Sequence, residues 1–135
     1  MVAKSAGYSG TPLARKLGLK PEHRLVLRHA PRGWSIPDPP PGVQTVRDVE
    51  SADVVLVFYR AHAGLAAEAP SLAGLLRKGA MLWVAWPRKA GGHTSDIAEN
   101  DLRELLLPTG LVDVKVAALD EDWSGLKFVW RKNSA

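Results

Sequence analysis

The chain has 135 residues, 46% of them hydrophobic and 24% charged, which is typical of a single globular domain. It contains no cysteine, so disulfides, thiolate metal sites, iron–sulfur clusters and a cysteine nucleophile are excluded. The longest apolar runs are too short to span a bilayer, and no apolar segment follows Lys4 as it would in a signal peptide. We therefore expect one domain over residues 1–135, in a cytoplasmic protein with no membrane partner.

The net charge of +4 is concentrated near the N-terminus, where residues 1–32 contain seven lysines and arginines and the single acid Glu22. Such a region can contact nucleic acid or an acidic partner, and the alternative is a solvated basic arm. The candidate partner-binding residues are Tyr8, Arg15, Lys16, Lys20 and, in an acidic turn near the C-terminus, Trp123.

The first 23 residues are predicted to form a loop and a short helix. Thr11 is placed to cap this helix, Pro12 suits its first position, and Gly18 ends it. A compact apolar run with charged ends, residues 24–28, is the first predicted strand. Residues 35–42 carry four prolines, three of them consecutive, so they predict an irregular surface loop before a short strand at 43–46.

Two strong strands follow. Residues 53–59 are apolar on both faces, as in a parallel strand covered by helices on both sides. The helical segment 61–78 should break at Pro70 into pieces at 62–69 and 70–78, with Gly79 as its stop. Residues 80–89, AMLWVAWPRK, predict the central buried strand, which delivers Arg88 and Lys89 to one edge of the sheet.

The last third of the chain predicts a helix and two strands. Asp96 and Glu99 resemble a capping box that opens a helix ended by Pro108. Residues 112–119 alternate in polarity like an edge strand, and the short turn at 120–125 implies an antiparallel partner at 126–131. The predicted fold class is α/β, with a mainly parallel sheet flanked by helices and an antiparallel strand at the C-terminal end.

This order of elements, the passage at 75–84 and the closing strand pair at 111–130 resemble the class I S-adenosylmethionine-dependent methyltransferases, which implies a Rossmann-like fold. Three segments, GYSGTPLARKLGLK, LWVAWPRKAGG and LVDVKVAALDEDWSGLKFV, also resemble a family of small bacterial proteins of unknown function. That second resemblance implies a family without implying an activity.

The methyltransferase resemblance implies a cofactor over a glycine-rich turn after the first strand and an acid at the end of the second. Here the turn is 29–33, which contains one glycine, a proline and extra positive charge. Asp48 is either the ribose ligand or an exposed turn acid. We therefore predict a methyltransferase-like fold that uses no cofactor, with S-adenosylmethionine as the disfavoured alternative.

Open α/β sheets bind ligands beyond the carboxyl ends of their strands, and cations and aromatic residues gather there. The candidate residues for an anionic ligand are Arg28, His29, Tyr59, Arg60, Trp86, Arg88, Lys89, Thr94 and Ser95. A phosphate, nucleotide or carboxylate would suit them. The alternative is that Trp86 closes the core and the cations pair with acids or water.

No complete catalytic or metal motif accompanies this edge. The four histidines lack metal-ligand spacing, and neither a P-loop nor a serine elbow is present, so no metal is expected and the catalytic residues are unknown. The leading interpretation is a non-catalytic binding or regulatory domain that recognises a small anion or a protein, as a monomer or a homodimer. The alternative is a divergent methyltransferase, and the third reading is a nucleic-acid-binding accessory protein.

Overall fold

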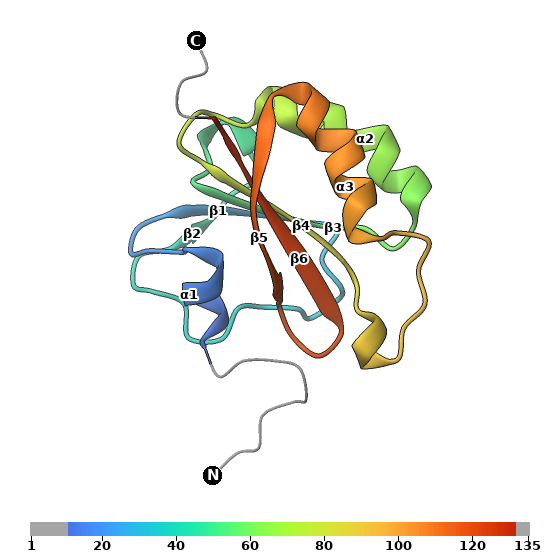
Figure 1. The fold of residues 1–135 in the computed structure, drawn as a ribbon. Helices are drawn as coiled ribbons and strands as arrows, with labels where there is room; N and C mark the ends of the chain where they lie inside the picture. Colours follow the sequence, from blue (N-terminus) through green and yellow to red (C-terminus); the bar gives the residue numbers. More distant parts are fainter. Residues whose placement is uncertain (1–10, 132–135) are drawn as a thin grey trace.

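A computed structural model describes residues 11–131, which form one six-stranded sheet in the order β2-β1-β3-β4-β6-β5 (Figure 1). Strands β2, β1, β3 and β4 are parallel, and β6 runs antiparallel to both of its neighbours. The predicted Rossmann-like α/β fold with an antiparallel C-terminal strand is thereby confirmed. The strands are β1 Arg24–Arg28, β2 Gln44–Thr45, β3 Val54–Phe58, β4 Met81–Pro87, β5 Leu111–Ala118 and β6 Trp123–Trp130.

Helices cover both faces of this sheet. Figure 1 shows α2 (His62–Leu75) and α3 (Glu99–Leu106) on one side and α1 (Leu13–Leu17) on the other. Three short 3-10 helices, η1 Val49–Ser51, η2 Lys89–Gly91 and η3 Leu107–Thr109, lie in the connections. The core is accordingly divided into two apolar clusters, one beneath α2 and α3 and one beneath α1.

Strand β3 is buried at all five positions, because it lies inside the sheet and both of its faces are covered. Neighbouring β4 is buried from Leu82 to its end. Trp83 in this strand is 0% exposed, and its indole N–H donates to the Leu17 carbonyl oxygen at 3.0 Å. This bond ties the end of α1 to the centre of the sheet.

The predicted break in the second helix is wrong. Helix α2 runs without interruption through Pro70, because buried residues on both sides of the proline, Leu65 and Leu72 among them, pack into the same cluster. That packing outweighs a proline cost of about 3 kcal/mol. The helix also ends at Leu75 instead of Lys78, and the following Leu76 is buried.

The predicted capping box is wrong as well. The Asp96 carboxylate accepts the His62 N–H at 2.7 Å, so Asp96 caps the start of α2. Helix α3 begins at Glu99, and there the Asp101 carboxylate accepts the Ala98 N–H at 2.7 Å. At the N-terminus, Pro12 precedes α1 and is not its first residue.

The bond from Trp83 predicts a specific loss of stability. Trp83→Phe should lower the free energy of unfolding by about 2 kcal/mol or more, because it leaves the buried Leu17 carbonyl without its donor and removes ring volume. Trp86→Phe removes the same volume from an indole that donates no hydrogen bond within residues 11–131, and it should cost less. Urea unfolding of both variants measures the difference, and equal losses would contradict the assignment.

Candidate functional site

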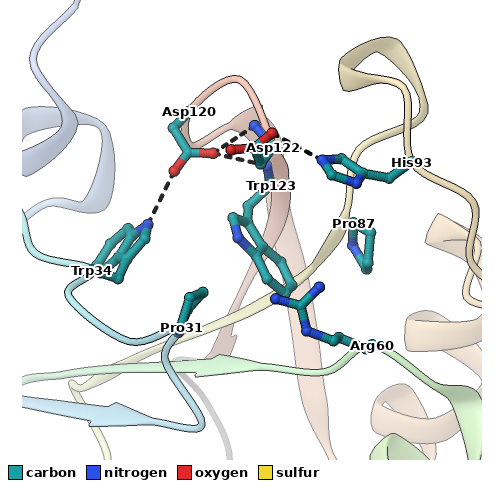
Figure 2. A pocket seen from close by; sticks show the side chains of 8 residues that line it. All are labelled: Pro31, Trp34, Arg60, Pro87, His93, Asp120, Asp122 and Trp123. Carbon is teal, nitrogen blue, oxygen red and sulfur yellow. Dashed lines mark hydrogen bonds and ion pairs between the residues drawn. The ribbon is translucent and has the colours of Figure 1, made fainter.

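The carboxyl edge of the sheet carries a hollow of about 210 Å³, which we call the rim hollow. It lies where β3 and β4 end and where the loop after β1 meets the β5–β6 turn (Figure 2). Its lining residues are Pro31, Trp34, Arg60, Pro87, His93, Asp120, Asp122 and Trp123. Four separate segments of the chain therefore contribute to one small site.

Aromatic rings form one wall of the rim hollow. Phe58 contacts Trp34 and Trp123 edge to face, with 4.9 Å between ring centroids in both pairs. The Arg60 guanidinium lies over the Trp123 ring, 5.0 Å from its centroid. An aromatic surface beside a cation and two carboxylates can hold a ligand that has both a flat ring and polar groups.

The carboxylates of the rim hollow are held in fixed positions. Asp120 accepts the indole N–H of Trp34 at 3.0 Å and the backbone N–H groups of Asp122 and Trp123 at 2.8 Å each. The Asp122 carboxylate lies 2.9 Å from Nε2 of His93. Figure 2 shows these bonds joining the loop after β1, the β5–β6 turn and the loop after η2.

The segment around η2 packs against the β5–β6 turn and bonds to its backbone. The Arg88 N–H donates to the Asp122 carbonyl oxygen at 2.8 Å, and the Arg88 guanidinium donates to the Glu121 carbonyl oxygen at 3.3 Å. A β-carbon on Gly91 would lie only 2.1 Å from the Glu121 carbonyl oxygen. The close approach therefore requires glycine, and the buried Arg88 holds the turn in place.

A second hollow of about 390 Å³, the His29 hollow, lies on the same edge and shares Arg60 with the rim hollow. Its lining residues are His29, Phe58, Tyr59, Arg60, Ala61, Gly64 and Glu68. Oε1 of Glu68 accepts the Tyr59 hydroxyl at 2.7 Å and lies 2.8 Å from Nε2 of His29. One glutamate on α2 thus joins the side chains that follow β1 and β3.

This cluster shifts two pKa values in opposite directions. Burial, followed by the hydrogen bond to Glu68, raises the pKa of Tyr59. The hydrogen bond from Tyr59, followed by that from His29, lowers the pKa of Glu68. Glu68 is therefore an ionised acceptor at neutral pH, and Tyr59 is a neutral donor.

His29 also shapes the loop after β1. Its φ of 62° lies in the left-handed region, and Gly33 follows with a φ of 77°. Counting glycines in the sequence finds one residue suited to a sharp turn here, whereas histidine supplies a second. The loop therefore makes a tight reversal despite its single glycine.

The predicted ligand-binding residues are only partly brought together. His29, Tyr59 and Arg60 line the hollows, and Arg28 lies close enough to act electrostatically on Tyr59 and Glu68. Trp86 is 8% exposed and belongs to the core, which is the alternative weighed for it in the sequence.

The remaining predicted residues have other positions. Lys89 and Thr94 line neither hollow, and the Ser95 hydroxyl donates to the Arg60 carbonyl oxygen at 3.2 Å. Because α3 starts at Glu99, Thr94 and Ser95 form no helix N-terminus, so that expectation is wrong.

The candidate partner-binding residues are also separated. Tyr8 lies outside the described residues. Arg15, Lys16 and Lys20 lie in or next to α1, whereas Trp123 is part of the rim hollow. Asp48, weighed as a ribose ligand, instead accepts the Glu50 N–H at the start of η1.

Several site residues were not found from the sequence. These residues are Pro31, Trp34, Glu68, His93, Asp120 and Asp122. Two signals in the sequence could have pointed to some of them. One is an aromatic residue in a Pro/Gly loop directly after a strand, and the other is a pair of acids beside a tryptophan in a turn. Within residues 11–131, no group of three His, Asp or Glu side chains could hold a metal ion, and no helix is both long and apolar enough to cross a bilayer.

Comparison with protein-family models and with curated protein sequences finds no match. Solved structures do match in fold. An S-adenosylmethionine-dependent methyltransferase from Aquifex aeolicus aligns over 86% of both chains at 10% identity, with a TM-score of 0.58. Magnesium protoporphyrin IX methyltransferase from Synechocystis PCC 6803, with S-adenosylmethionine bound, aligns over 88% of this chain and 74% of its own, at 12% identity and a TM-score of 0.54.

Aeropyrum pernix fibrillarin, solved with natively bound S-adenosylmethionine, aligns over 87% of this chain and 73% of its own, at 17% identity and a TM-score of 0.52. At these identities the likeness establishes the fold. The chain has the Rossmann-like fold of S-adenosylmethionine-dependent methyltransferases. The resemblance to a small bacterial family stays a prediction.

These neighbours correct two predictions. The interpretation as a non-catalytic binding or regulatory domain is contradicted, because the neighbours described above include two methyltransferases by name. The expectation of no cofactor is contradicted as well, because two of the neighbours hold S-adenosylmethionine. One physical reason for the error is that a count of glycines overlooks His29, which adopts a left-handed conformation in the turn after β1 as Gly33 does.

The contact at Gly91 predicts that its substitution opens the site. Gly91→Ala should lower the free energy of unfolding by about 1–3 kcal/mol, because the new methyl group must push η2 away from the β5–β6 turn. Gly74→Ala is the matched control, since nothing lies within 4 Å of a β-carbon there and alanine favours the helix by about 0.5–1 kcal/mol. Thermal unfolding distinguishes them, and a stable Gly91→Ala protein would contradict the contact.

The Tyr59–Glu68 bond predicts a pH effect. Because the pKa of Glu68 is lowered in the folded protein, its contribution to stability is present above the ordinary pKa of glutamate and is lost as the pH falls through the folded value. Tyr59→Phe should therefore move the pKa of Glu68 back toward 4.5 and destabilise the protein at neutral pH more than in acid.

Carboxyl NMR titration measures this shift directly. His29→Ala should move the same pKa by less, because the bond from Tyr59 has the larger effect. A Glu68 titration curve that Tyr59→Phe leaves unchanged would rule out the bond.

Proposed function

We propose that this protein is a divergent S-adenosylmethionine-dependent methyltransferase whose cofactor binds at the carboxyl edge of β1 and β3. The observation that carries the proposal is the position of the loop after β1, which forms a wall of both hollows. Pro31 and Trp34 line the rim hollow and His29 lines its neighbour. The resemblance to methyltransferases implies that the loop after the first strand holds the cofactor.

The side chains at the rim fit the cofactor chemically. The rings of Trp34 and Trp123 suit an adenine base, the carboxylate of Asp122 suits ribose hydroxyls or an ammonium group, and Arg60 suits a carboxylate. When bound, the cofactor supplies a methyl group carried on a sulfonium. Half of the eight lining residues are tryptophan or proline, so a bound ring displaces water from their apolar surface.

The volume of the rim hollow limits how much of the cofactor it can hold. Small-molecule sites typically enclose about 300–1,000 Å³, so the rim hollow alone is too small for the whole cofactor. The larger His29 hollow adjoins it across Arg60. Because Arg60 is exposed, its side chain can move aside, and a long ligand can extend from one hollow into the other.

Glu68 also orients the His29 ring in this wall. An ionised Glu68 can only accept hydrogen bonds, so Nε2 of His29 carries the proton in their 2.8 Å contact. This bond holds the ring of His29 at the edge of the His29 hollow.

Two expectations from the sequence belong to this proposal. One is membership in the small bacterial family that shares the GYSGTPLARKLGLK segment. The other is a cytoplasmic location, which the absence of cysteine supports.

Calorimetric titration with S-adenosylhomocysteine tests the proposal. We expect micromolar binding by the wild-type protein, and a loss of about tenfold or more for Arg60→Ala, because a charge-assisted hydrogen bond contributes about 1.5–3 kcal/mol. Arg47→Ala is the matched control, since this exposed arginine lines neither hollow, and it should bind as the wild type does.

The proposal fails if the wild-type protein gives no heat and its melting temperature does not rise with millimolar ligand. Equal affinities for Arg60→Ala and the wild type would reject the assigned site while leaving a cofactor bound elsewhere.

A further inference from the structure

A groove of about 520 Å³ lies between α1 and the edge strand β5, and we call it the lysine groove. Its lining contains three cations and no acid. The lining residues are Thr11, Arg15, Lys16, Lys115, Val116, Ala117 and Ala118. An adjoining hollow of about 390 Å³ shares Arg15 and adds Lys20. Arg15 therefore belongs to both hollows, whose combined lining holds four cations.

Two further observations show that the positive charges are crowded together. Lys115 stands directly opposite Lys127 in the β5–β6 ladder, an arrangement of like charges that destabilises a sheet. Burial, followed by repulsion from Lys115, lowers the pKa of Lys127, and burial, Arg88 and Lys115 together lower the pKa of Lys16. Within residues 11–131, no acid lines the groove to offset this repulsion.

An irregularity in β5 delivers Lys115 to this face. Asp113 pairs with Phe128 and bonds Arg103 of α3, so it lies on the α3 side of the sheet. Alternation would place residue 115 on that same side. A bulge between Asp113 and Lys115 reverses the alternation and sets Lys115 against Lys127, on the side of α1.

The cations in and beside the groove are held differently. Lys16 is 9% exposed, and its ammonium group donates to the Ala118 carbonyl oxygen at 2.7 Å, which places a positive charge at the floor of the groove. Arg15, Lys20 and Lys115 are exposed. Within residues 11–131, no ion pair includes these three or Lys127.

We propose that the lysine groove binds the phosphate backbone of a single-stranded nucleic acid. A flexible single strand can place its phosphates inside a groove lined by several cations, whereas a bilayer surface cannot enter a groove. Each phosphate neutralises lysine charge, relieves the repulsion between Lys115 and Lys127, and releases counterions. This inference goes beyond the proposed methyl transfer, and it holds whether or not the cofactor binds.

Fluorescence anisotropy with a labelled single-stranded RNA of mixed sequence tests it, in salt from 50 to 300 mM. We expect wild-type affinity to fall steeply with salt. The double variant Arg15→Gln, Lys115→Gln removes two exposed cations of the groove lining, so it should bind on the order of tenfold more weakly and reduce the log–log salt slope by about 1.4, the value for two lost phosphate contacts. It should also have a urea midpoint at least as high as the wild type, because a like-charge pair has been removed.

The control is Arg47→Gln, Lys89→Gln, which removes the same charge from exposed residues outside the groove and should bind like the wild type. Equal losses of affinity in both double variants would show that binding depends only on net charge, and would overturn the proposal. So would an absence of RNA binding at 50 mM salt, including the case in which the protein binds only phosphatidylserine vesicles.

Discussion

The burial of β3 and β4 on both faces is the constraint on which the rest of the structure depends. A strand covered on both sides has no place for a charged side chain along its length, so polar residues appear only where the strand ends. Arg60 and Arg88 follow β3 and β4 in this way. The loop after β1 and the β5–β6 turn meet them at the same edge, and both hollows result from that meeting.

The strands were predictable because their signal is local, whereas the errors arose where tertiary contacts decide. Hydrophobic runs located β1, β3 and β4 to within about one residue at most ends, but Pro70 remains inside α2 through packing with distant residues, and Asp96 caps the helix before it in the sequence. The strand predicted at 126–131 begins at Trp123, inside the predicted turn, and as β6 it lies between β4 and β5. No single-residue pattern encodes these choices.

Of the site residues, only those that lie at the ends of strands were predictable from the sequence. Arg28, His29, Tyr59 and Arg60 follow from the rule that ligands bind beyond the carboxyl ends of strands. Glu68 lies on a helix face, and Asp120 is bound by Trp34 from a segment 86 residues earlier, so neither can be placed without the fold. The left-handed conformation of His29 is similarly invisible to a search for glycine, and it answers the objection that the turn has a single glycine.

The bulge in β5 has a consequence for how the sheet ends. Val114 and Val116 are 49% and 48% exposed on the edge strand, which is the composition of a strand prone to add another chain. The interrupted ladder at Asp113 and the charge of Lys115 make this edge a poor template, because an incoming strand would meet an irregular spacing and a cation. The same local insertion that positions a lysine therefore also protects the protein against open-ended aggregation.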